Sequence, residues 1–126
     1  MADSVKLQKI VIEGAADGPH MLITGGVHGD EYESMAAIRR LAAELRADQI
    51  SGRLTLVPVV NESAYVLQQR CGADDMDLAR TCPGKADGTI SERTAHALSE
   101  LIETADYYID LHTGGQICQV LPLSGY

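Results

Sequence analysis

The sequence of 126 residues has no tryptophan and no phenylalanine, and its aromatic side chains are five tyrosines. A hydrophobic core must therefore be built from Leu, Ile, Val, Met and Ala. Basic residues are also scarce, with 10 Lys and Arg against 18 Asp and Glu. The net charge of −8 argues against nucleic-acid binding, because no basic stripe is present to neutralise phosphates. An anionic small molecule is still compatible with this charge, since its site needs only one or two arginines.

Disulfide pairs and long apolar runs are missing as well. The three cysteines, Cys71, Cys82 and Cys118, form no Cys-x-x-Cys pair. Their odd number favours free thiols in a reducing compartment over a disulfide framework. No apolar run approaches the roughly 18 residues of a membrane span, and no signal-peptide pattern opens the sequence. We therefore expect a cytoplasmic protein that does not bind membranes.

The pattern of apolar residues predicts an α/β fold in a single domain. Apolar residues at three- and four-residue steps predict helices over 32–47 and from a Thr89-to-Glu92 capping box to about residue 104. The stretch 61–88 is rich in Gly, Pro and Asp and predicts a long irregular connection. Short apolar runs predict strands over 5–13, 20–26, 53–60, 106–111 and 117–123. We expect a mixed, largely parallel sheet with helices on both faces.

Two histidines follow predicted strands, and each is accompanied by glycines. The stretch 25–31 links an apolar run to a helix and contains His28 and Glu31, three residues apart. On its own, this pair is also compatible with a solvated turn. His112 closes a second strand and precedes two glycines. Ligands in parallel or mixed sheets gather at the carboxyl ends of strands, and two His with one Glu leave a fourth zinc position open for water. This is the pattern of a catalytic zinc site.

Further motifs follow in a fixed order along the chain. They are Gly26-Val27-His28-Gly29-Asp30-Glu31, Pro58-Val59-Val60-Asn61, Arg70, Asp77-Leu78-Ala79-Arg80, Pro83-Gly84, Glu92-Arg93 and Asp110-Leu111-His112. In this order the chain resembles the succinylglutamate desuccinylase/aspartoacylase family, which belongs to the zinc-carboxypeptidase-like hydrolases. The resemblance covers nearly the whole chain and implies that fold. Residues 1–126 would form the N-terminal, metal-binding part of the catalytic domain.

The resemblance also implies roles for individual residues. It implies one zinc ion per chain, bound by His28, Glu31 and His112. Arg70 would polarise the scissile carbonyl, Arg80 and Asn61 would bind substrate, and Asp77 would hold His28 through its second ring nitrogen. Judged by residue type alone, Arg70 is more readily interpreted as a solvated arginine and Asp77 as an ordinary loop carboxylate. The matching order of the motifs reverses that preference.

Several positions depart from the family pattern. Ala79 stands where the family has Asn, which removes one hydrogen-bond donor to the substrate. Cys82 replaces a common aromatic residue, and Glu62 replaces a common proline. The family's general-base glutamate lies in a later part of the chain, and none of Glu33, Glu62 and Glu103 has its sequence context. We therefore expect a truncated chain with impaired activity.

The expected activity of the parent protein is zinc-dependent hydrolysis of an amide bond in an N-acyl amino acid or a related small molecule. A carboxypeptidase acting on peptides is the first alternative, and a non-catalytic zinc-binding module is the second. A third is that no metal binds and the histidines are structural. An exposed sheet edge in a partial domain would also favour homo-oligomers.

Overall fold

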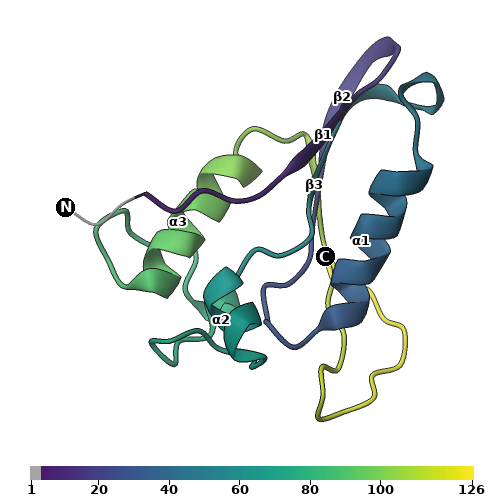
Figure 1. Ribbon diagram of the computed structural model, residues 1–126. Coiled ribbons are helices and arrows are strands. Elements are labelled where there is room, and N and C mark those ends of the chain that lie inside the picture. The colour runs from purple at the N-terminus through teal and green to yellow at the C-terminus, as the bar shows by residue number, and fades with distance from the viewer. Residues whose placement is uncertain (1–3) are drawn as a thin grey trace.

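The computed structural model describes residues 4–126 and shows a sheet with a helix on each face (Figure 1). The strands are β1 (Ile10–Glu13), β2 (Ala16–Thr24), β3 (Ser51–Val57) and β4 (Tyr107–Asp110), in the order β1-β3-β2-β4. β1 is antiparallel to β3, whereas β2 is parallel to both β3 and β4. The prediction of a mixed, largely parallel sheet is confirmed. The predicted domain covers residues 1–126, and its residues 1–3 lie outside the described residues. The start of the chain, which the signal-peptide prediction concerns, therefore also lies outside them.

The two long helices cover opposite faces because successive strand residues point to opposite sides of the sheet. α1 (Tyr32–Glu44) packs Ile38 against Leu54 and Leu56, while α3 (Ile90–Ile102) packs Leu98 against the face that carries Leu22. The buried apolar residues of the described chain are Leu, Ile, Val, Met and Ala, as the composition predicts. No helix within residues 4–126 is long and apolar enough to cross a bilayer.

The predicted capping box at the start of α3 is confirmed. The Thr89 side chain accepts from the Glu92 backbone N–H, and the Glu92 carboxylate accepts from the Thr89 N–H. Asp74 adds a second contact, accepting from Ser91 N at 2.9 Å and Ser91 Oγ at 2.7 Å. Burial alone would raise the pKa of Asp74, but hydrogen bonds from Thr89 and Ser91 outweigh it and lower the pKa to about 2.

Substituting Asp74 with Asn is expected to flatten the acid dependence of stability. Because the pKa of Asp74 is lower in the folded state than the ordinary value of 3.8, its contribution is present above about pH 4 and is lost as the pH falls toward 2. Urea midpoints between pH 2 and pH 6 should therefore converge for wild type and Asp74→Asn at the acid end. The neighbouring exposed carboxylate offers a control, Asp75→Asn. A constant difference between Asp74→Asn and wild type at every pH would contradict this expectation.

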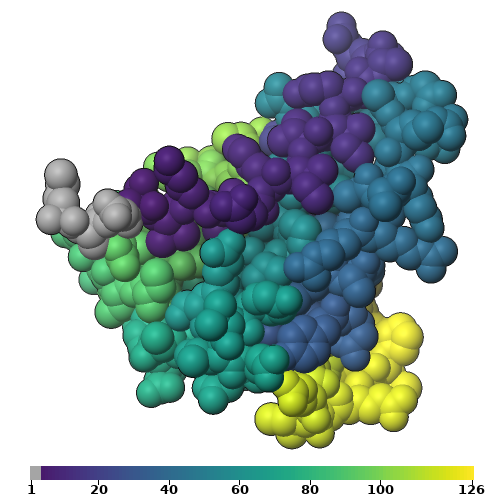
Figure 2. Space-filling view, viewed as in Figure 1, coloured from purple at the N-terminus to yellow at the C-terminus, as the bar shows by residue number. Residues whose placement is uncertain are grey.

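Two segments differ from the sequence-based prediction. The predicted strand over 117–123 is wrong: this stretch has no regular structure, and Ile117 and Leu121 are 90% and 82% exposed. After β4 the chain turns toward α1, and Gln116 donates to Tyr32 Oη at 3.4 Å and to Gln68 O at 3.2 Å. Figure 2 shows this C-terminal segment as a yellow lobe at the margin of the molecule.

The second difference lies in the predicted irregular stretch 61–88. It contains a short helix, α2 (Glu62–Leu67), and the 3-10 turn η2 (Leu78–Arg80). Asn61 caps α2 by accepting from Ala64 N at 3.1 Å. Other differences concern boundaries: α1 is followed by the 3-10 helix η1 (Ala47–Gln49), β1 is shorter than predicted, and β2 begins at Ala16, four residues before the predicted 20–26 strand.

Candidate metal centre

The turn after β2 is shaped by close backbone contacts. Gly25 N–H donates to Val57 O at 3.0 Å, and Asn61 N–H donates to Gly26 O at 2.8 Å, so the turn runs beside the segment that follows β3. Gly26 has a φ of +66°, which favours glycine. A Cβ on Gly29 would lie 2.1 Å from the backbone carbon of Ala64, so this glycine is required by the approach of α2. The turn thereby presents His28 and Glu31 just before α1.

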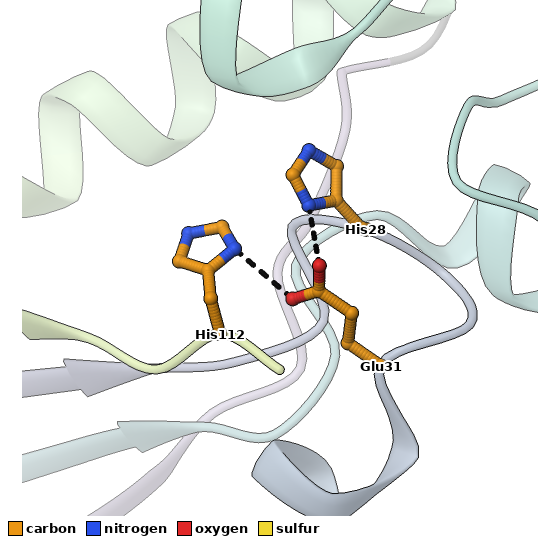
Figure 3. Close-up of side chains that lie close together, drawn as sticks. All are labelled: His28, Glu31 and His112. Carbon is orange, nitrogen blue, oxygen red and sulfur yellow. Dashed lines mark hydrogen bonds and ion pairs between the residues drawn. The ribbon is translucent and has the colours of Figure 1, made fainter. Parts of the chain in front are cut away.

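Three side chains from two distant segments meet at this turn (Figure 3). His28 Nδ1 lies 2.9 Å from Glu31 Oε1, and His112 Nδ1 lies 3.0 Å from Glu31 Oε2. One ligand atom of each residue lies within 4.8 Å of the others. The side chains of His28 and Glu31 are each 4% exposed, whereas that of His112 is 39% exposed. The cluster therefore has a closed side at His28 and an open side at His112.

The second nitrogen of each imidazole faces another carboxylate. His28 Nε2 donates to Asp77 Oδ1 at 3.0 Å, and His112 Nε2 donates to Asp110 Oδ2 at 2.6 Å; these donor assignments follow from the network. With these protons on Nε2, both Nδ1 lone pairs face the Glu31 carboxylate. Such an arrangement requires positive charge between the groups, either protons or a cation. Two imidazole nitrogens and a carboxylate suit zinc, so the residues fit this metal.

Asp110 belongs to a motif named in the sequence analysis, but no role was predicted for it there. It lies two residues before His112 at the end of β4, where an Asp-x-His pattern places a carboxylate beside the imidazole. The tendency of ligand histidines to donate to carboxylates is the signal that would have identified it.

The other predicted site residues differ in whether hydrogen bonds connect them to the three clustered side chains. Arg70 donates to Asp77 Oδ2 from Nη2 at 3.0 Å and from Nε at 3.2 Å, so it connects to His28 through Asp77. Burial would raise the pKa of Asp77, but hydrogen bonds from His28 and Arg70 lower it to about 2. Arg80 is exposed, and its Nη1 lies 3.5 Å from Ala79 O. Neither this contact nor the α2 cap made by Asn61 reaches the three clustered side chains.

The sequence profile of the succinylglutamate desuccinylase/aspartoacylase catalytic domain matches residues 17–126. The chain belongs to this family. A relative within the succinylglutamate desuccinylase/aspartoacylase family is the N-alpha-acetyl-L-2,4-diaminobutyric acid deacetylase of Halomonas elongata. It is 35% identical over 117 residues, which cover 91% of this chain and 34% of the deacetylase.

Solved structures agree with the succinylglutamate desuccinylase/aspartoacylase assignment. A succinylglutamate desuccinylase/aspartoacylase from Rhodobacter sphaeroides is 41% identical with a TM-score of 0.81, covering 88% of this chain and 35% of that protein. The product-bound ectoine utilization protein EutE (DoeB) from Ruegeria pomeroyi is 39% identical with a TM-score of 0.77, covering 84% and 33%. The chain thus spans roughly a third of the length of these relatives. The tripeptide-bound cell shape determinant Csd4 from Helicobacter pylori, 20% identical with a TM-score of 0.70 over 94% of this chain and 30% of that protein, shares the zinc-carboxypeptidase-like fold.

Proposed function

We propose that this chain forms the metal-binding part of a zinc-dependent hydrolase that cleaves the amide bond of an N-acyl amino acid. The observation that carries the proposal is the convergence of His28, Glu31 and His112, whose ligand atoms lie within 4.8 Å of one another. Family membership and the deacetylase name of the Halomonas relative support amide hydrolysis as the reaction. The three free cysteines support a reducing, cytoplasmic location.

In this proposal the three clustered residues hold one zinc ion. Zinc bound there would polarise a carbonyl and lower the pKa of a coordinated water to about 7. His28 and His112 would offer Nδ1, because Asp77 and Asp110 accept the proton on the opposite ring nitrogen. The open side at His112 is the side from which substrate would enter.

In this proposal Arg70 and Arg80 interact with the substrate. The Arg70 side chain is 51% exposed and is oriented by Asp77, so its guanidinium can stabilise a developing oxyanion beside the metal. Arg80 is exposed and would bind a substrate carboxylate as a bidentate donor. Asn61 is buried and would act indirectly, since it caps the helix that packs against Gly29.

The test is an assay of the complete protein purified without chelator. We expect about one zinc per chain and zinc-dependent release of the amine from an N-acyl amino acid, with N-acetyl-2,4-diaminobutyrate and N-succinylglutamate as first substrates. Substituting Arg70 with Ala should lower kcat/KM by about 100-fold while zinc is retained, because an oxyanion donor is lost. Arg40→Ala, which breaks an exposed ion pair with Glu44, is the matched control.

Each alternative gives a different result in the same assay. Cleavage of short peptides without turnover of N-acyl amino acids would indicate a carboxypeptidase. Bound zinc without any hydrolysis would indicate a non-catalytic module. Full activity in zinc-free protein would overturn the proposal.

A further inference from the structure

A series of hydrogen bonds leads from His112 into the sheet. Thr24, at the end of β2, and Asp110, at the end of β4, are register partners on adjacent parallel strands. Thr24 Oγ1 lies 2.7 Å from Asp110 Oδ1 and 3.0 Å from the hydroxyl of Tyr108. Asp110 uses its other oxygen for His112 Nε2. Tyr108, Thr24, Asp110 and His112 therefore form one connected network.

The direction of each hydrogen bond follows from the donors available. An ionised carboxylate only accepts, so the single hydroxyl proton of Thr24 goes to Asp110. The Thr24 oxygen must then accept from the Tyr108 hydroxyl. Burial and the charge of Asp110 raise the pKa of Tyr108 to about 12, although its hydrogen bond with Thr24 acts in the opposite direction, so the phenol keeps its proton. Tyr108 thus donates to Thr24, Thr24 to Asp110, and His112 to Asp110 from the opposite side.

His28 and His112 depend to different degrees on hydrogen bonds for the orientation of their rings. The His28 side chain is 4% exposed and is enclosed by its surroundings. The His112 side chain is 39% exposed, so packing restricts its ring less, and hydrogen bonds must supply more of the orientation. Asp110, whose side chain is 23% exposed, can orient His112 only if its own rotamer is held. Thr24 is fully buried, which makes it a rigid point of attachment for that carboxylate.

We propose that Tyr108 and Thr24 are positioning residues of the metal centre: they hold Asp110 so that it directs His112 Nδ1 toward Glu31. This inference rests on the proposed zinc site. Neither residue contacts the three clustered ligands in the hydrogen bonds described, so the effect is transmitted through Asp110. Residues that form hydrogen bonds to metal ligands commonly tune metal affinity. In this network Asp110 is such a residue, and Thr24 and Tyr108 lie one and two hydrogen bonds beyond it.

Zinc affinity of the full chain, measured by competition with a chromophoric chelator, tests the inference. Direct partners of ligand histidines change affinity by about 10- to 100-fold, so we expect that range for Asp110→Asn, about 10-fold for Thr24→Val and about 3-fold for Tyr108→Phe. Thr24→Ser keeps the hydroxyl and should stay close to wild type. Tyr107→Phe is the matched control, because Tyr107 precedes Tyr108 on β4, faces the opposite side of the sheet and is 59% exposed.

A second measurement does not depend on zinc. In the metal-free protein the Nε2 proton of His112 should give a downfield NMR resonance that is protected from exchange by Asp110. Tyr108→Phe and Thr24→Val should shift this resonance and speed its exchange, whereas Tyr107→Phe should leave it unchanged. Tyr108→Phe removes one hydroxyl from a residue that is 38% exposed, so it keeps the test valid if Thr24→Val unfolds.

The outcomes separate this inference from the proposed function. Wild-type protein that binds no zinc would contradict the proposed function, and the NMR resonance would still decide whether the network orients His112. Wild-type zinc affinity in Tyr108→Phe together with an unchanged resonance would overturn the inference, even if the protein is a zinc hydrolase.

Discussion

Replacing His112 with alanine is expected to lower zinc affinity by about 100-fold or more. Structural zinc sites bind with roughly 10–16 kcal/mol shared among four ligands, so one ligand accounts for about 3 kcal/mol. His112 is the residue of the proposed zinc site that the second segment contributes, and without it His28 and Glu31 would form a two-ligand pair on one turn. Elemental analysis after dialysis, and chelator competition on the folded variant, would measure the loss.

The control for this experiment is His96→Ala. His96 lies in α3, pairs with Glu100 at 3.7 Å, and has a side chain that is 39% exposed, the same fraction as in His112. Alanine at His96 should leave zinc affinity unchanged. If His112→Ala retained stoichiometric zinc with wild-type affinity, the ion would have to bind elsewhere and the site assignment would fail.

The second large effect is expected at Gly29. An alanine Cβ there would lie 2.1 Å from the backbone carbon and 2.3 Å from the oxygen of Ala64. Backbone atoms cannot rotate away, so either α2 or the turn that carries His28 must move. Overpacking of this kind costs typically about 1–3 kcal/mol, and displacement of His28 would also weaken zinc binding. Urea unfolding would report the first effect and chelator competition the second.

Gly125→Ala is the matched control, because within residues 4–126 no atom other than those of Gly125 and its chain neighbours lies within 4 Å of a Cβ built at Gly125. It introduces the same methyl group into open space. Equal urea midpoints for Gly29→Ala and Gly125→Ala would show that the contact between the turn and α2 is not close in solution.

The sequence was most informative where the determinants were local. The α3 capping box spans only four positions, Thr89 to Glu92, and each hydrogen bond follows from residue type. The histidine motifs were recognisable because an apolar run ends in glycines at the same place as a potential ligand. The close approach of His28 and His112 also agrees with the prediction, since both follow parallel strands that pair with each other. That these side chains bind zinc stays a prediction.

Other features depended on tertiary context. The apolar residues over 117–123 match a strand pattern, but β4 pairs with β2 on one side and the following chain crosses toward α1 instead of extending the described sheet. The α2 helix is only six residues long, too short for a periodic signal, and is stabilised by its Asn61 cap and its contact with Gly29. The network from Tyr108 to Asp110 depends on the β2–β4 register, which residue spacing does not reveal.

The separation of the ligands along the polypeptide has a consequence for folding. His28 and Glu31 can pair as soon as their turn forms, whereas His112 arrives from a segment 81 residues after Glu31. The third residue of the proposed site is in place only when β4 is docked beside β2, a pairing between segments that lie far apart in the sequence. A bound ion would therefore link the turn after β2 to the segment after β4. Loading with zinc would selectively slow the detachment of β4 from the sheet.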